Sequence, residues 1–185
     1  MDIGESGYRR YLDGDQSGFD DVMNAYHDNL IYFVDDLVHN LTVAEDIAAD
    51  SFAELIIHPK RFKADSSLKT YLFSVARHKA LDYIRAEAHH GGVGYDETLD
   101  DEADTTSLEN SVIHDERSRR LHAALTQINK EYATVLYLMY FEGMDVREVA
   151  MVIKKNSRQV TNLIYRAKAA LKVVLEREGL TDYDE

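Results

Sequence analysis

Cysteine is absent from this chain of 185 residues, and proline occurs only once. The lack of cysteine excludes disulfides, thiolate zinc sites and cysteine nucleophiles, and it is compatible with a reducing cytosol. No apolar run approaches the roughly 20 residues that a bilayer-spanning helix needs, and the opening stretch MDIGESGYRRYLDGD has no apolar signal core. We therefore expect a soluble, cytoplasmic protein without direct membrane association.

Basic residues are also missing from one long stretch. Residues 91–116 contain nine carboxylates and no lysine or arginine, within a chain whose formal net charge is -13. By segment, the net charge is -10 for residues 1–60, +3 for 61–90, -9 for 91–116, +6 for 117–178 and -3 for 179–185. Because a nucleic acid responds to the local patch that it meets, the overall acidity does not exclude nucleic-acid binding.

Helix breakers are scarce, with nine glycines and the single proline, and apolar residues recur at three- and four-residue intervals almost throughout. This pattern predicts an all-α fold with two small helical domains, at residues 1–90 and 107–178. Residues 91–106 combine low hydrophobicity with like charge, which predicts a flexible acidic linker. Residues 179–185 are expected to form a disordered acidic tail.

Polar residues that can cap helices precede several of the apolar patterns. The expected capping residues are Ser17, Thr42 (in a capping box with Glu45), Asn129, Asp145 (with Glu148) and Ser157. Pro59 is expected to end the second helix, and a third helix is predicted from about residue 67 to residue 87.

The C-terminal block has the proportions of a helix-turn-helix. A short helix is followed by the turn Lys154-Lys155-Asn156 and by a longer helix with a cationic outer face. Such a unit places its second helix in the major groove of DNA, where residues near the helix start meet the base edges. From spacing alone, an ordinary bundle with a solvated basic surface is an equally good interpretation. The outward residues for base contacts are Arg158, Gln159, Thr161, Asn162 and Tyr165, and those for phosphates are Lys155, Arg166, Lys168 and Lys172.

Aromatic and basic residues are interleaved between residues 62 and 85. Bases of a single strand stack on aromatic rings while cations neutralise its phosphates, so this mixture favours single-strand binding. The competing interpretation places Tyr71 and Phe73 in the core. The residues concerned are the aromatic Phe62, Tyr71, Phe73 and Tyr83 and the basic Lys63, Lys69, Arg77, Lys79 and Arg85.

Three segments together resemble the bacterial extracytoplasmic-function (ECF, group IV) sigma factors. AEDIAADSF (44–52) is similar to the region 2 segment that binds the clamp of core RNA polymerase, and TYLFSVARHKALDYIR (70–85) is similar to the segment that melts and reads the -10 promoter element. Residues 125–171 resemble region 4, whose helix-turn-helix reads the -35 element. The resemblance covers residues 19–177, and the order and spacing of the segments are more specific than any single motif.

The resemblance implies an alternative sigma factor whose partners are core RNA polymerase, promoter DNA and an anti-sigma factor, free or membrane-anchored. It implies no cofactor, no metal ion and no catalytic residue. The loop of residues 61–67 would hold an extruded -10 base, and Phe52 would be internal packing. The implied core-polymerase-binding residues are Glu45, Asp46, Asp50 and Glu54; the -10 DNA-binding residues are Arg61, Phe62, Lys63, Ser66, Arg77, His78, Lys79 and Arg85; the -35 DNA-binding residues are Lys155, Arg158, Gln159, Thr161, Asn162, Tyr165, Arg166 and Lys168.

Several positions depart from the usual family pattern. Lys154 stands where glycine is common in the turn, and Thr161 and Leu163 stand where basic residues are frequent, which implies weaker or differently specified -35 recognition. His78 replaces a frequent asparagine beside the melted strand, and Ala49 replaces a frequent glutamine on the polymerase-binding segment. The acidic linker would either mimic a nucleic acid in the polymerase channels or act as a solubilising spacer.

Two other functions fit parts of the composition. Eight histidines and 34 carboxylates could supply a metal-dependent hydrolase, but no His-Glu-x-x-His or other paired-ligand spacing occurs. A stand-alone helix-turn-helix transcriptional regulator would use the second block alone, as a dimer, and bind a palindromic duplex tightly without polymerase. A sigma factor would instead bind DNA weakly by itself and need core polymerase for promoter-specific transcription.

Overall fold

The computed structural model describes residues 2–90 and 116–178, and within these ranges every regular element is a helix. The chain divides into two compact units, residues 1–108 and 109–185. The predicted all-α class with two helical units is therefore confirmed. The predicted linker (91–106) and tail (179–185) lie outside the described residues.

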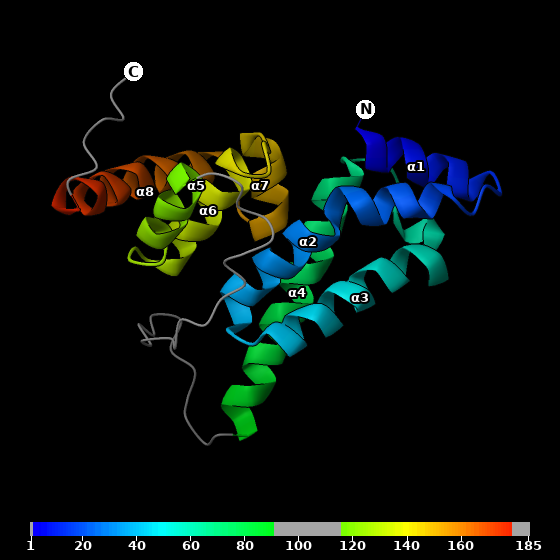
Figure 1. Cartoon of the computed structure of the whole chain (residues 1–185), viewed down its shortest axis with the longest axis horizontal. Coiled ribbons are helices and arrows are strands. Elements are labelled where there is room, and N and C mark those ends of the chain that lie inside the picture. The colour runs from blue at the N-terminus through cyan, green and yellow to red at the C-terminus, as the bar shows by residue number, and fades with distance from the viewer. Residues whose placement is uncertain (1, 91–115, 179–185) are drawn as a thin grey trace. The chain divides into compact units, whose positions relative to one another are not determined.

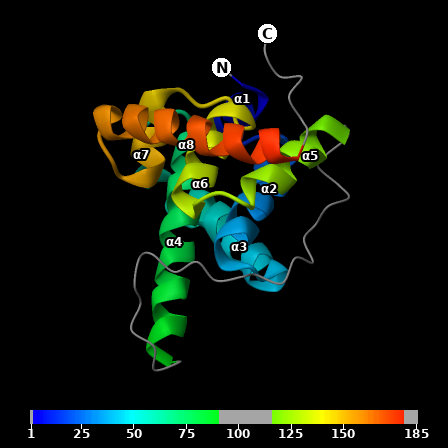
Figure 2. The ribbon, with the colours of Figure 1, turned by 90° about the vertical axis from the view of Figure 1, so that its left-hand side faces the viewer.

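Unit 1 is built around α2, which packs against three other helices. Figures 1 and 2 show α3 and α4 beside α2, and α1 against its first half. The side chains at the centre are fully buried and come from all four helices: Tyr8, Val22, Leu30, Phe33, Val34, Leu55, Leu68, Leu72 and Phe73. The elements are α1 (Ile3–Leu12), α2 (Gly18–Val38), α3 (Leu41–Ile57), the short 3-10 helix η1 (Pro59–Arg61) and α4 (Leu68–His90).

Helix α1 was not predicted from the sequence, because its glycines obscure the helical pattern. Those glycines are the points where α1 approaches α2 most closely. A Cβ atom on Gly7 would lie 2.5 Å from the backbone oxygen of Gly18 and 2.5 Å from Cβ of Asp21. Tyr8, which is 1% exposed, donates its hydroxyl hydrogen to the Leu55 carbonyl at 2.9 Å, and its burial raises its pKa to about 12. Small residues and one buried tyrosine thus attach α1 to the rest of unit 1.

Of the predicted helix caps in unit 1, one is wrong and the other has the right position but no side-chain bond. Helix α3 is capped by Asn40, whose Oδ1 accepts the Val43 N–H at 3.2 Å, and not by a box at Thr42, which lies inside the helix. Ser17 occupies the N-cap position of α2 but makes no side-chain cap bond; its own N–H donates to Asp15 Oδ1. The end of α3 before Pro59 and the predicted third helix agree with the structure, although α4 continues to residue 90.

Unit 2 consists of α5 (Glu116–Leu125), α6 (Lys130–Tyr140), α7 (Val146–Ile153) and α8 (Ser157–Arg177), and Figure 2 shows α8 crossing α6. A small core joins α5, α6 and α8 through Leu125, Leu136 and Ala167. His122 of α5 is only 9% exposed and its ring centroid lies 4.2 Å from that of Phe141. This burial lowers the pKa of His122 to about 4.

Candidate nucleic-acid interface

Helices α7 and α8 form a helix-turn-helix, as predicted. Helix α7 ends at Ile153, and its C-cap residue Lys154 adopts the left-handed conformation with φ 54°. The Lys155 N–H donates to the Ala150 carbonyl at 3.0 Å. Asn156 then caps α8: its side chain accepts the Gln159 N–H, while Gln159 Oε1 accepts the Asn156 N–H, both at 2.9 Å. The cap is therefore Asn156 and not the predicted Ser157, which is the first residue of the helix.

The outer face of α8 carries most of the residues that the sequence predicted for DNA. Tyr165 is 78% exposed, and Lys168 places its Nζ 5.4 Å from the ring centre of Tyr140 on α6. Inward side chains, including Val160 and Ala167, are fully buried. The predicted residues that the structure exposes on this face are Arg158, Gln159, Thr161, Asn162, Tyr165, Arg166 and Lys168.

Three of the predicted -35 residues take part in hydrogen bonds or ion pairs within the chain. Gln159 uses its carbonyl oxygen in the cap, and Thr161 donates its hydroxyl to the Ser157 carbonyl at 2.9 Å. The half-buried Lys155 forms an ion pair with Glu131 of α6, Nζ to Oε1, at 2.9 Å. Sequence reasoning missed Glu131, because the pairing depends on how α6 packs against α8 and not on spacing along one helix.

The predicted -10 loop is held in place by aromatic packing. Phe62 is half-buried, with its ring centroid 5.9 Å from that of Tyr8 and 5.4 Å from that of Tyr71. Phe73 is fully buried, which confirms the core interpretation for that residue, and Tyr71 is half-buried. Ala64, at the middle of the loop, has φ 56°, a conformation that side-chain-bearing residues rarely adopt. Phe62 therefore positions the loop as well as forming part of it.

The structure joins the two predicted surfaces of unit 1 by ion pairs. Arg61 Nη1 lies 2.6 Å from Glu54 Oε2, and Lys79 Nζ lies 3.3 Å from Asp50 Oδ2. Each pair connects a residue predicted to bind -10 DNA with one predicted to face polymerase. On α4, His78 and Arg85 both contact Asp82, at 3.1 and 2.9 Å. Of the remaining predicted -10 residues, Lys63 is exposed and Ser66 and Arg77 are half-buried.

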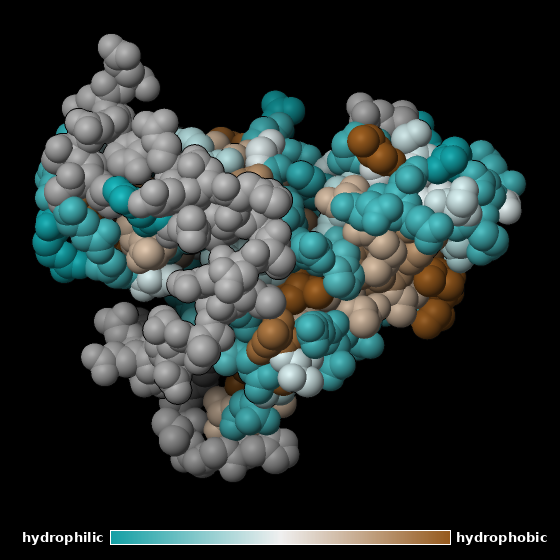
Figure 3. All heavy atoms as spheres, viewed as in Figure 1, coloured by the Kyte–Doolittle hydropathy of each residue, from teal (hydrophilic) through white to brown (hydrophobic). Residues whose placement is uncertain are grey.

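The outer face of α3 is acidic and ends in apolar side chains. Glu45, Asp46 and Asp50 are exposed, whereas Phe52 is only 3% exposed and packs inside, as predicted. Ile56 and Ile57 at the end of this helix are 48% and 67% exposed, and Figure 3 shows apolar surface over this end of α3. Exposed apolar groups beside charges are typical of a protein-binding surface.

Within residues 2–90 and 116–178, no three histidine or carboxylate side chains gather closely enough to hold a metal ion. None of the helices described there is long and apolar enough to cross a membrane. The side chains exposed on α8 and around the loop of residues 61–67 include donors, cations and aromatic rings, which are groups that bind a polyanion and stack on bases.

A helix-turn-helix with an exposed cationic second helix defines a DNA-binding transcription factor. Two family profiles match the chain, Sigma-70 region 2 over residues 9–90 and Sigma-70, region 4 over residues 118–171. The chain therefore belongs to the sigma-70 family. The second profile contains α7, the turn and α8 up to residue 171, and the first contains the predicted -10 loop, α3 and α4.

Curated relatives match along nearly the whole chain. The RNA polymerase sigma-H factor of Pseudomonas aeruginosa is 25% identical over 172 residues, covering 88% of this chain and 89% of the relative. The ECF RNA polymerase sigma factor SigX of Bacillus subtilis is 26% identical over 167 residues, covering 87% and 86%. The chain is accordingly an alternative sigma factor of the ECF type, which directs transcription initiation.

Solved structures have the same fold. The sigma factor RpoE of Bartonella quintana, in complex with the anti-sigma factor NepR, gives a TM-score of 0.64 at 18% identity, covering 86% of this chain and 98% of that one. CnrH, in complex with the cytosolic domain of CnrY, gives 0.62 at 18% identity, covering 95% and 99%. A stand-alone regulator that used only the second unit would not account for the match of region 2.

Proposed function

We propose that this chain is a group IV sigma factor in which α3 binds core RNA polymerase, the loop of residues 61–67 with α4 reads the -10 element, and α8 reads the -35 element. The observation that carries the proposal is the presence of both matched regions, region 2 followed by region 4, in this one chain. In this role the chain acts with polymerase in the cytoplasm and catalyses no reaction itself. The functional domains are residues 1–90 and 107–178, with the acidic residues 91–106 between them.

At the -10 element, the loop binds a base that has left the duplex. Packing of Phe62 between Tyr8 and Tyr71 holds the loop in place. Binding of an extruded base therefore requires little further ordering of the loop, which lowers the entropic cost of binding. Arg61 and Lys79 exchange their carboxylate partners for strand phosphates, while Arg77, His78 and Arg85 of α4 follow the strand further. Binding of an unstacked base supplies both melting and base selection.

At the -35 element, α8 enters the major groove with its start toward the bases. Arg158 and Asn162 are exposed near that start and provide side chains that can bond base edges, and Tyr165 provides an apolar ring. Thr161 presents its methyl group, because its hydroxyl bonds its own helix. Arg166 and Lys168 contact phosphates. Recognition thus relies on fewer cations at base edges than the family commonly uses.

Polymerase binds the outer face of α3, through Glu45, Asp46, Asp50 and Glu54. The exposed Ile56 and Ile57 extend this surface. An anti-sigma factor that covers the same helix would block polymerase, and the complexes of RpoE with NepR and of CnrH with the cytosolic domain of CnrY support such a partner for this chain.

The test is transcription by core polymerase from the same organism on fragments of that organism's genome, with and without the purified chain. We expect new RNA 5′ ends that share upstream elements only when both proteins are present. Arg158→Ala should lower initiation at those promoters by about 10- to 100-fold, as expected when one good base contact is lost. Val173→Ala, at an exposed position further along α8, is the matched control and should leave initiation unchanged.

Failure of the chain to bind or redirect core polymerase would refute the proposed function. Tight binding of the free chain to a palindromic duplex, with no effect on core polymerase, would instead support a stand-alone regulator.

A further inference from the structure

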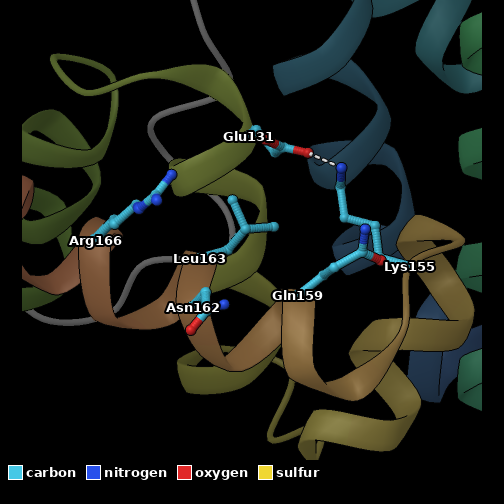
Figure 4. A pocket seen from close by; sticks show the side chains of 6 residues that line it. All are labelled: Glu131, Lys155, Gln159, Asn162, Leu163 and Arg166. Carbon is cyan, nitrogen blue, oxygen red and sulfur yellow. Dashed lines mark ion pairs between the residues drawn. The ribbon is translucent and has the colours of Figure 1, made fainter.

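A pocket lies between the start of α6 and one side of α8 (Figure 4). Lys155 and Arg166 stand at its two ends, with Leu163 between them and Glu131 reaching in from α6. Three of its lining residues, Gln159, Asn162 and Arg166, also belong to the exposed face of α8 that is predicted to contact DNA. The lining residues are Glu131, Lys155, Gln159, Asn162, Leu163 and Arg166.

Nearly all the polar groups of this pocket are suited to an anion. Lys155 and Arg166 are cations that only donate hydrogen bonds. Gln159 engages its carbonyl oxygen with the Asn156 N–H at 2.9 Å, which leaves its amide nitrogen, a donor, for a ligand. A phosphate has only acceptor oxygens, so it complements this set of donors.

Glu131 is the one anion in the pocket. Its Oε1 lies 2.9 Å from Lys155 Nζ, and the two side chains are 43% and 33% exposed, respectively. Its position in the first turn of α6, after the cap made by Asn129, favours a negative charge electrostatically. A phosphate at the same place would receive the same stabilisation, so a carboxylate and a phosphate compete for one position.

We propose that this pocket binds a backbone phosphate of duplex DNA and that Glu131 competes with that phosphate for Lys155, which weakens -35 binding by the unbound chain. The inference rests on the proposed function, because it assumes that α8 enters duplex DNA. The pair is partly exposed and of ordinary strength, so exchange of the carboxylate for a phosphate is readily reversible. Glu131 therefore lowers the affinity for DNA without preventing it.

The salt dependence of binding distinguishes this role from a purely structural one. In the natural chain, transfer of Lys155 to a phosphate releases a DNA counterion but leaves the Glu131 carboxylate unpaired beside the DNA, where it takes up a cation, so the net release is small. In Glu131→Gln the same lysine must replace a counterion of the DNA, and the slope of log affinity against log salt steepens by about 0.9. Affinity at low salt should rise by about two- to fivefold, the range expected for one partly exposed ion pair.

The experiment measures binding of the full chain to a labelled duplex of mixed sequence, about two helical turns long, by fluorescence anisotropy over a series of salt concentrations. Glu178→Gln is the matched control. It also removes one carboxylate, at the end of α8, but this carboxylate accepts a hydrogen bond from Gln127 and does not pair with a lysine. Lys155→Gln is combined with Glu131→Gln in a double-mutant cycle. We expect Glu131→Gln to have no effect once Lys155 has been replaced.

The inference would be overturned if the natural chain and Glu131→Gln had equal affinities and equal salt slopes. It would also be overturned if neither protein bound the duplex detectably at the lowest salt. A gain that persists in the Lys155→Gln background, or that Glu178→Gln reproduces, would also overturn it. Failure of the proposed function is seen separately, as loss of promoter-specific transcription with core polymerase.

Discussion

Arg61 Nη1 lies 2.6 Å from Glu54 Oε2, so that a residue of the candidate -10 loop is held by a residue of the candidate polymerase surface. Lys79 and Asp50 repeat this relationship between α4 and α3 at 3.3 Å. Polymerase would bind the carboxylate of each ion pair, and DNA would bind the cation of the same pair. If the proposed roles hold, a partner that engaged the α3 carboxylates would release these cations for the promoter strand and so couple the two binding events.

The coupling predicts opposite effects for Glu54→Gln. The free chain should bind a single-stranded oligonucleotide about two- to fivefold more tightly, because Arg61 no longer has a competing carboxylate. Affinity for core polymerase should fall, because the candidate surface loses a charge. Fluorescence anisotropy and competition for core polymerase measure the two effects. Glu87→Gln, at an exposed carboxylate near the end of α4, is the control; an equal gain in that variant would contradict the explanation.

The approach of α1 to α2 predicts that Gly7 cannot be replaced. In Gly7→Ala the new Cβ would meet the Gly18 carbonyl oxygen at 2.5 Å, and because that atom is backbone the helices must separate. We expect a loss of about 1–3 kcal/mol in the free energy of unfolding, the usual cost of overpacking. Urea unfolding followed by circular dichroism measures the change. Ser6→Ala, exposed on the same helix, should be neutral or slightly stabilising, and similar losses in both variants would contradict the steric argument.

The sequence was sufficient to predict the helix class, the two units and the helix-turn-helix, because apolar periodicity is a local signal. It was insufficient for α1, where Gly7 weakens the helical pattern. The need for glycine at this position becomes clear only from the close approach of the Gly18 backbone in the folded chain. The sequence was also insufficient for the pairs Glu54–Arg61 and Glu131–Lys155, since both depend on how separate elements pack. Residue type identified candidate binding groups, but only tertiary structure identified their partners.

The turn of the helix-turn-helix stores backbone strain at Lys154. Its φ of 54° lies in the left-handed region, which glycine adopts without the steric cost that a Cβ atom imposes. We expect Lys154→Gly to raise the free energy of unfolding of unit 2 by about 0.5–1 kcal/mol, because relief of strain exceeds the entropy that glycine adds to the unfolded chain. Thermal unfolding measures this gain. Lys154→Ala removes the same charge and keeps the strain, so stabilisation of similar size in that variant would contradict the backbone explanation.

His122 makes the stability of unit 2 depend on pH. Burial lowers its pKa from the ordinary 6.5 to about 4, so between these values the unfolded chain binds more protons than the folded one, and stability falls as the pH falls. Between pH 7 and pH 5 the loss attributable to this residue is about 2 kcal/mol. His122→Phe keeps a ring against Phe141 and removes the titrating group. Between pH 7 and pH 5, this variant should therefore lose about 2 kcal/mol less of its free energy of unfolding than the natural chain. Urea unfolding at both pH values, followed by NMR signals of α6, measures the difference, and signals of α2 in unit 1 serve as the control. An unchanged pH dependence of α6 in His122→Phe would show that other groups are responsible.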